Sequence, residues 1–254
     1  MSSSENDVFS GYPAPVHHLG VIDSTNALAL EALANGAPEG SLFIAEAQRR
    51  GRGQRGNVWH SPPGGHLYLS MLLRPRWPLE HWGRLTLCVG VLAAEAIHAV
   101  SQQPVRLKWP NDLILHGAKL GGVLCEARLE PPAGVVVGLG VNISGSAQEL
   151  GVPERRVITL AEMSAGRVVE PSLRLKLAAK VATAVLAELG CPHPAFSEMM
   201  ARWRRLSVLP ATLRDSAGKQ MRAIDVSDDG QLIIQVDGAL RQLNAASGLL
   251  WEDV

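Results

Sequence analysis

Residues 49–56 of this 254-residue chain read Arg-Arg-Gly-Arg-Gly-Gln-Arg-Gly, and they separate two apolar, strand-like runs at residues 41–46 and 67–73. Four guanidinium groups this close repel one another, so a fold that keeps them must present them to something anionic. The planar guanidinium suits phosphate and carboxylate oxygens, and the glycines let backbone amides approach a ligand closely. The sequence therefore predicts an anion-binding loop between two strands, which we expect to become ordered when its ligand binds.

The same loop contains the spacing of a dinucleotide-binding fingerprint. Gly51, Gly53 and Gly56 match G-x-G-x-x-G, but such a fingerprint must open a helix directly after its strand. Residues 57–65 contain two prolines and end in two glycines, so they cannot begin a helix. No acidic residue follows about twenty positions on, where the ribose partner belongs. We therefore set aside a Rossmann-type site.

Composition narrows the class of protein. The chain is 46% hydrophobic and 19% charged with a formal net charge of zero, which argues against binding DNA or an anionic membrane through a global field. The apolar stretch at residues 85–100 contains Glu95 and His98 and reads as too short to span a membrane, and the N-terminus lacks a basic, apolar signal. The three cysteines are far apart and show no metal-binding spacing. We expect a cytoplasmic protein without a clustered metal site.

Periodicity divides the chain into two parts. Helices are predicted at residues 27–34, 84–100, 172–189 and 195–206, and strands at 41–46, 67–73, 105–109, 113–115, 120–129 and 135–141. Beyond residue 206 the runs are short and strand-like, with Asp229-Gly230 and Asp237-Gly238 as turn signals. The predicted class is α+β: a mixed β-sheet catalytic domain flanked by helices (residues 1–206), followed by a small antiparallel β-barrel (residues 207–254).

Several short polar segments lie where apolar strands end or helices begin. Each has a plain interpretation taken singly: a helix cap at residues 24–26, a turn at 109–112, a solvated lysine at Lys119 and a bulge at 138–142. Together they supply arginine, lysine, amide and one carboxylate, but neither a nucleophile–base pair nor a metal triad. That set favours chemistry that needs positioning and charge stabilisation, namely nucleotidyl or acyl-adenylate transfer.

In combination and order, these segments resemble those of the biotin protein ligases. The match covers roughly residues 20–145, and its motifs are Ser24-Thr25-Asn26, Gln48, Gly51-Arg52-Gly53-x-Arg55-Gly56-x-x-Trp59, Ser61-Pro62-x-Gly64, Leu67-Tyr68-Leu69-Ser70, Lys108-Trp109-Pro110-Asn111-Asp112, Lys119-Leu120-x-Gly122 and Gly138-x-Gly140-x-Asn142. The resemblance implies that biotin and MgATP give biotinyl-5′-AMP, and that a lysine of a biotin carboxyl carrier protein then takes the biotinyl group. It also implies an SH3-like C-terminal domain and leaves a homodimer open.

The resemblance also implies roles for individual residues. Lys119, Arg52 and Asp112 would carry the chemistry, with Lys119 between carboxylate and phosphate. The residues expected against biotin are Ser24, Thr25, Asn26, Gln48, Gly51, Arg52, Gly53, Gln54, Lys119, Gly122, Gly138 and Gly140. Those expected against ATP or the adenylate are Arg55, Trp59, Asn111, Asp112 and Asn142, with Mg²⁺ carried by ATP.

Two departures from the family pattern stand out. Gln54 occupies the place of an arginine in the family's loop, so one charge that retains the adenylate is missing unless Arg49 or Arg50 replaces it. Ser24 also lies too near the start for the family's N-terminal helix-turn-helix domain, so we expect a ligase-only member without DNA binding. The alternatives are a lipoate ligase of the same fold, a nucleic-acid-binding module using the arginine loop, and a biotin-responsive regulator without catalysis.

Overall fold

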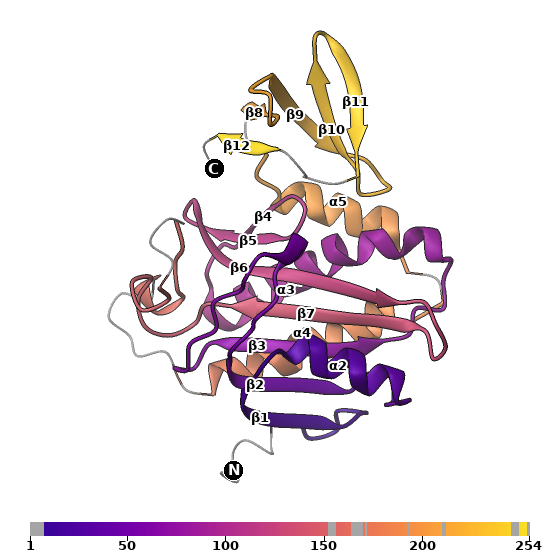
Figure 1. Cartoon of the computed structure of the whole chain (residues 1–254), viewed down its shortest axis with the longest axis vertical. Coiled ribbons are helices and arrows are strands. Elements are labelled where there is room, and N and C mark those ends of the chain that lie inside the picture. Colours follow the sequence, from indigo (N-terminus) through magenta and orange to yellow (C-terminus); the bar gives the residue numbers. More distant parts are fainter. Residues whose placement is uncertain are drawn as a thin grey trace.

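The computed structural model describes residues 8–151, 156–163, 170, 172–192, 194–209, 212–244 and 249–252. Its main feature is a seven-stranded sheet in the order β1-β2-β3-β7-β6-β5-β4 (Figure 1). The strands are β1 (Val16–Ile22), β2 (Leu42–Gln48), β3 (Leu67–Leu73), β4 (Arg106–Lys108), β5 (Asp112–Leu115), β6 (Ala118–Arg128) and β7 (Gly134–Val141). β1 and β2 are parallel and the other neighbours antiparallel, which confirms the predicted mixed sheet.

Helices cover both faces of the sheet. On one face α2 (Thr25–Ala34) packs Ala29 and Leu33 onto Phe43, Leu72 and Val136. On the other face lie α3 (Leu85–Ser101), α4 (Leu173–Leu189) and α5 (Phe196–Leu206) (Figure 1). Every residue of β3 is buried, as its continuous apolar run predicts, because the strand is covered from both sides.

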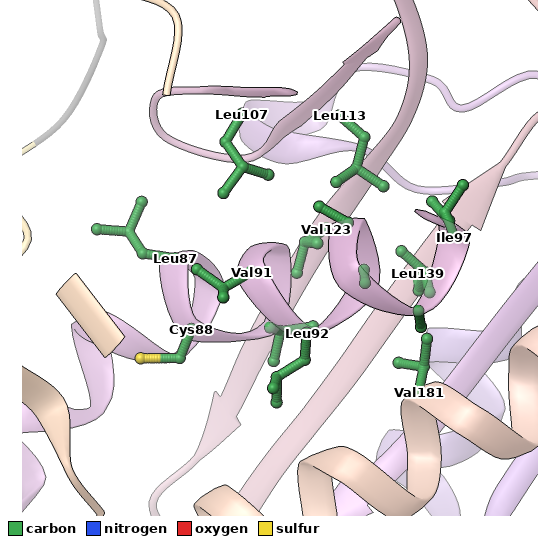
Figure 2. Packing of buried hydrophobic residues seen from close by; sticks show 14 of the residues in the cluster. Leu87, Cys88, Val91, Leu92, Ile97, Leu107, Leu113, Val123, Leu139 and Val181 are labelled. Carbon is green, nitrogen blue, oxygen red and sulfur yellow. The ribbon is translucent and has the colours of Figure 1, made fainter. Parts of the chain in front are cut away.

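Helix α3 is the centre of the larger core. Figure 2 shows its apolar side chains, including Val91 and Leu92, between strand residues such as Leu113 and Leu139 and the helix residue Val181. A 3₁₀ turn (Leu79–Arg84) precedes α3. The turn and α3 together form a helical segment of 23 residues, which is long enough and apolar enough to cross a membrane by length and composition alone. The prediction that this stretch is too short to span a membrane was therefore wrong. Its apolar composition is accounted for by packing, since 61% of the window is buried inside the protein.

A second sheet follows α5. It contains β8 (Thr212–Arg214), β9 (Gln220–Val226), β10 (Leu232–Val236), β11 (Ala239–Leu243) and β12 (Leu250–Glu252) in the antiparallel order β11-β10-β9-β8-β12. Within residues 212–244 and 249–252, no pairing joins the edge strands β11 and β12, so the described strands form an open sheet and not the closed barrel we expected. β8 and β12 have three residues each, which leaves few positions for ladder pairing.

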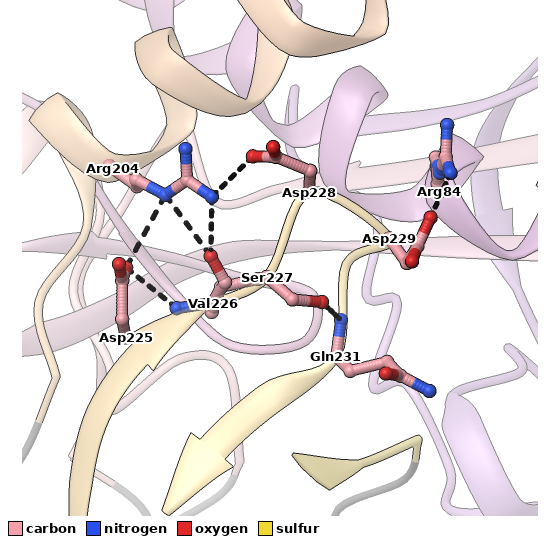
Figure 3. A network of polar contacts seen from close by, with 8 residues as sticks. All are labelled: Arg84, Arg204, Asp225, Val226, Ser227, Asp228, Asp229 and Gln231. Atoms are coloured by element: carbon pink, nitrogen blue, oxygen red, sulfur yellow. Dashed lines mark hydrogen bonds and ion pairs between the residues drawn. The ribbon is translucent and has the colours of Figure 1, made fainter.

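The turn between β9 and β10 fastens this second sheet to the first part of the chain (Figure 3). The Arg204 guanidinium donates to the Val226 carbonyl at 2.8 Å and to Asp228 at 2.6 Å, and Arg84 forms an ion pair with Asp229. The Trp109 indole N–H donates to the Gly230 carbonyl at 3.0 Å. Because Trp109 precedes the predicted site residues Asn111 and Asp112, the C-terminal sheet is connected to one wall of the site.

Candidate active site

A cavity of about 820 Å³ opens where α2 begins, β2 ends, and β6 and β7 cross the middle of the sheet. This volume is in the range of small-molecule sites. Of the seventeen predicted site residues, all but Gly51 and Asn142 line it: Ser24, Thr25, Asn26, Gln48, Arg52, Gly53, Gln54, Arg55, Trp59, Asn111, Asp112, Lys119, Gly122, Gly138 and Gly140. Residues as far apart as 24 and 140 thus converge on one volume.

One end of the cavity is built from uncharged polar groups. Ser24 caps α2, its hydroxyl accepting from the Ala27 N–H at 3.4 Å. Thr25 donates to the Gln48 amide oxygen from its backbone N–H at 2.8 Å and from its hydroxyl at 3.1 Å. The Gln48 amide nitrogen donates in turn to the Ser61 hydroxyl at 2.8 Å, which fixes the orientation of this amide. The end is therefore a preorganised set of neutral hydrogen-bonding groups.

Asn26 is held in place beneath this end. Only 5% of it is exposed, the Ser70 hydroxyl donates to its amide oxygen at 2.5 Å, and its amide nitrogen donates to Glu126 at 2.8 Å. A Cβ atom on Gly138 would lie 2.9 Å from the Asn26 amide carbon, closer than such atoms pack. Gly138 therefore makes room for Asn26, in addition to any room it leaves for a ligand.

The arginine loop has a defined conformation. The Gly53 N–H donates to the Asn57 carbonyl at 2.8 Å and the Trp59 N–H to the Gly51 carbonyl at 2.9 Å, which makes residues 51–59 a small hairpin. Gly51 is buried at its base and does not line the cavity. Arg55 lies at its tip with a φ of 58°, in the left-handed region. The loop arranges its arginine side chains beside the cavity.

The arginines of the loop have different surroundings. Arg52 forms an ion pair with Glu126 at 2.7 Å, and Arg52 and Arg55 both line the cavity. Arg49 lies 3.8 Å from Asp23, and neither Arg49 nor Arg50 lines the cavity. This geometry gives no support to the idea that Arg49 or Arg50 replaces the charge missing at Gln54.

The cavity also has a cationic set of lining residues. Lys119 forms an ion pair with Asp112, and its ammonium nitrogen lies 5.5 Å from the centre of the Trp59 ring. Lys108 pairs with Asp112 in the β4–β5 register, and burial lowers the pKa of Lys108, with Asp112 opposing and Lys119 adding to that effect. Among the described residues, the cationic lining residues are Arg52, Arg55, Lys108, Lys119 and Arg156, against one carboxylate, Asp112. Such an excess of positive charge suits an anion.

One glycine and two amides complete the description. A Cβ on Gly140 would lie 2.5 Å from the Trp59 ring, so Gly140 lets the indole rest on β7. The Asn111 amide donates to the Val123 carbonyl at 3.0 Å. Asn142 lies outside the lining, and its buried amide donates to the Ile158 carbonyl at 3.3 Å. Asn142 therefore joins β7 to residues 156–160 in this structure and does not face the cavity.

Three residues near the cavity were not predicted as site residues. Lys108 lay inside a recognised motif but received no role, although a lysine at a strand end beside Asp112 is a signal for a charged site. Glu126 and Arg156 had no local signal, because β6 and residues 156–158 reach the site only through the tertiary fold. Among the described residues, no three His, Cys, Asp or Glu side chains gather into a metal-binding group.

Comparison with known proteins agrees with this geometry. Residues 19–142 match the biotin/lipoate A/B protein ligase family. A biotin–[acetyl-CoA-carboxylase] ligase from Paracoccus denitrificans is 30% identical over 232 residues, covering 89% of this chain and 95% of that protein. The bifunctional ligase/repressor BirA of Bacillus spizizenii is 34% identical over 152 residues, which are 47% of its length, so the chain matches about half the length of such relatives.

The fold has solved counterparts. A biotin protein ligase from Aquifex aeolicus, solved in complex with biotin and ATP, superimposes with a TM-score of 0.75 over 94% of this chain and 99% of that one, at 22% identity. The likeness supports the shared arrangement of sheet, helices and C-terminal strands. The chain therefore belongs to the biotin/lipoate A/B protein ligase family, as its motifs predicted.

Proposed function

We propose that this protein is a biotin protein ligase that activates biotin with ATP and transfers it to a lysine of a carrier protein. The observation that carries the proposal is the mixed polarity of the cavity lining, which combines the neutral hydrogen-bonding pair Thr25–Gln48 with the cations Lys108, Lys119 and Arg52. Biotin has the matching polarity, since its ureido ring is neutral and its chain ends in a carboxylate. The relatives named biotin–[acetyl-CoA-carboxylase] ligase support the same substrate.

The first step brings two anions together. A biotin carboxylate oxygen attacks the α-phosphorus of ATP, the bond from that phosphorus to the bridging oxygen breaks, and pyrophosphate leaves with the electron pair. Lys119 and Arg52 offset the repulsion and stabilise the charge that develops on the phosphoryl oxygens. Lys119 is suited to this role because Asp112 and the Trp59 ring hold its ammonium group at the cavity wall.

The second step transfers the biotinyl group. A neutral lysine amine of the carrier attacks the acyl carbon, the bond to AMP breaks, and the amine releases one proton as the amide forms. Asp112 is our candidate for orienting that amine, since it is the one carboxylate that lines the cavity in the part of the chain that the structure describes. The lysine of a biotin carboxyl carrier protein is the proposed acceptor.

Mg²⁺ belongs to this proposal as an ion carried by the ATP phosphates. Magnesium sites of this kind use one or two protein carboxylates together with phosphate oxygens, and Asp112 beside Asn111 fits that limited requirement. When bound, the ion would neutralise phosphate charge. The proposal also includes a cytoplasmic location, which fits the three free cysteines.

A lipoate ligase is the competing assignment, because the matching family includes both activities. The bicyclic ureido head of biotin needs several hydrogen-bonding partners, and the Ser24–Thr25–Gln48 arrangement provides them, whereas the dithiolane of lipoate needs none. Pyrophosphate exchange with biotin and with lipoate separates the two. We expect exchange with biotin only, and preferential exchange with lipoate would overturn the assignment.

A further inference from the structure

The Glu126 carboxylate joins two parts of the site that are distant in sequence. One of its oxygens accepts from the Asn26 amide nitrogen at 2.8 Å, and the other lies 2.7 Å from the Arg52 guanidinium. Asn26 belongs to α2 and Arg52 to the arginine loop, while Glu126 is on β6 in the middle of the sheet. The side chain of Glu126 is only 19% exposed. A single, largely buried carboxylate thus contacts the neutral end and the cationic loop at once.

These contacts determine which way the Asn26 amide faces. An ionised carboxylate only accepts hydrogen bonds, so the amide nitrogen of Asn26 must face Glu126. The Ser70 hydroxyl donates to the amide oxygen from the other side at 2.5 Å, and the amide nitrogen also donates to the Leu124 carbonyl at 3.3 Å. Both amide hydrogens are therefore used, and the oxygen keeps one acceptor position for a ligand N–H.

The contact with Arg52 leaves part of the guanidinium free. Its Nη2 atom lies 2.7 Å from Glu126, and no other described residue forms an ion pair with this side chain. The remaining N–H groups can bind an anion in the cavity that Arg52 lines. Glu126 therefore orients Arg52 without neutralising all of its hydrogen-bonding capacity.

We propose that Glu126 is a positioning residue that assembles the site before the ligand arrives, fixing the Asn26 amide and holding the arginine loop through Arg52. The identity of the ligand, biotin, rests on the proposed function above. Glu126→Gln should lose one of the two contacts that the carboxylate makes. Glutamine has one acceptor oxygen and one donor NH₂, so it keeps the contact to either Asn26 or Arg52 and faces the other with donor against donor.

Titration with biotin alone, without ATP, and trypsin digestion of the free protein test this proposal. Glu126→Gln should weaken biotin binding about tenfold, the effect of one charge-assisted hydrogen bond, and should speed cleavage after Arg52 and Arg55. Glu46→Gln is the matched control, because Glu46 also holds an arginine, Arg174 at 2.8 Å, but Arg174, unlike Arg52, does not line the cavity. It should change neither biotin binding nor loop cleavage.

An exchange variant distinguishes positioning from general loss of structure. Combining Glu126→Gln with Asn26→Asp moves the carboxylate acceptor to position 26, so the introduced glutamine can donate to it and accept from Arg52. Protection of the arginine loop against trypsin should then return. Equal biotin affinity and equal loop cleavage in Glu126→Gln and the natural protein would overturn the proposal. The proposal would also be overturned if Glu126→Gln were cleaved faster at arginines throughout the chain and the exchange variant did not recover. If the natural protein itself does not bind biotin, the proposed function is wrong. The comparison of trypsin cleavage rates still tests whether Glu126 holds the arginine loop, because it needs no ligand.

Discussion

Replacing Gly138 with alanine places a methyl group against the Asn26 amide. The added Cβ would lie 2.9 Å from both the amide carbon and the amide nitrogen of Asn26, so one side must move. The amide cannot turn away freely, because Ser70 and Glu126 hold its two ends. If Asn26 turns, the protein loses these hydrogen bonds, worth about 1 kcal/mol for a neutral bond and about 1.5–3 kcal/mol for the charged one. If the backbone moves, overpacking costs about 1–3 kcal/mol.

The two routes together predict that Gly138→Ala loses about 1–4 kcal/mol of unfolding free energy, and each kcal/mol lowers Tm by about 2–4 °C for a chain of this size. Gly122→Ala is the control, since Gly122 also lines the cavity but its Cβ would meet its nearest neighbour at an ordinary 3.6 Å. Denaturant unfolding should show Gly122→Ala close to the natural protein, although its methyl group intrudes on a bound ligand. Gly138→Ala within about 0.5 kcal/mol of the natural protein, the usual range for surface changes, would refute the reasoning.

Three further predictions concern charge. Lys119→Ala should lower pyrophosphate exchange by about 10²–10³-fold, as loss of a transition-state donor does, with little change in Tm; near-normal exchange in the folded variant would remove Lys119 from the mechanism. Gln54→Arg should release the biotinyl adenylate about tenfold more slowly, because a charged hydrogen bond replaces a neutral one; equal release rates measured by single-turnover chase would refute a leak at Gln54. Burial lowers the pKa of His66 below its usual 6.5, partly offset by Glu149, so its stabilisation is complete above pH 6.5 and is lost as the pH falls. Unfolding from about pH 7.5 to about pH 5.5 should therefore show a shallower loss of stability in His66→Gln, and parallel curves would contradict this.

The sequence predicts most of the elements for clear reasons. The all-apolar β3 run and the amphipathic α4 have strong periodicity, and their positions agree with the structure. β1 was missed because its residues, Val-His-His-Leu-Gly-Val-Ile, do not alternate, which suits a partly exposed edge strand. The open C-terminal sheet also differed from prediction, because strand propensity alone does not determine how edge strands pair.

The site was predictable where recognition depends on local motifs. Ser24, Gln48 and Lys119 each lie at the end of an element, and the fold brings them to one cavity. Glu126 could not be predicted, since it is a mid-strand residue whose importance comes from partners about a hundred and about seventy positions away. Asn142 shows the reverse case, because its motif suggested a ligand contact while its amide binds backbone carbonyls.

The transfer reaction itself tests the central claim most directly. The protein would be mixed with biotin, MgATP and a biotin carboxyl carrier domain, and intact-mass spectrometry would follow the carrier, with a carrier lacking its acceptor lysine as the control. We predict that the carrier gains the mass of one biotinyl group, that the gain requires ATP, and that lipoate does not replace biotin. A carrier whose mass stays unchanged while the folded protein binds both biotin and ATP would contradict the assignment of a ligase.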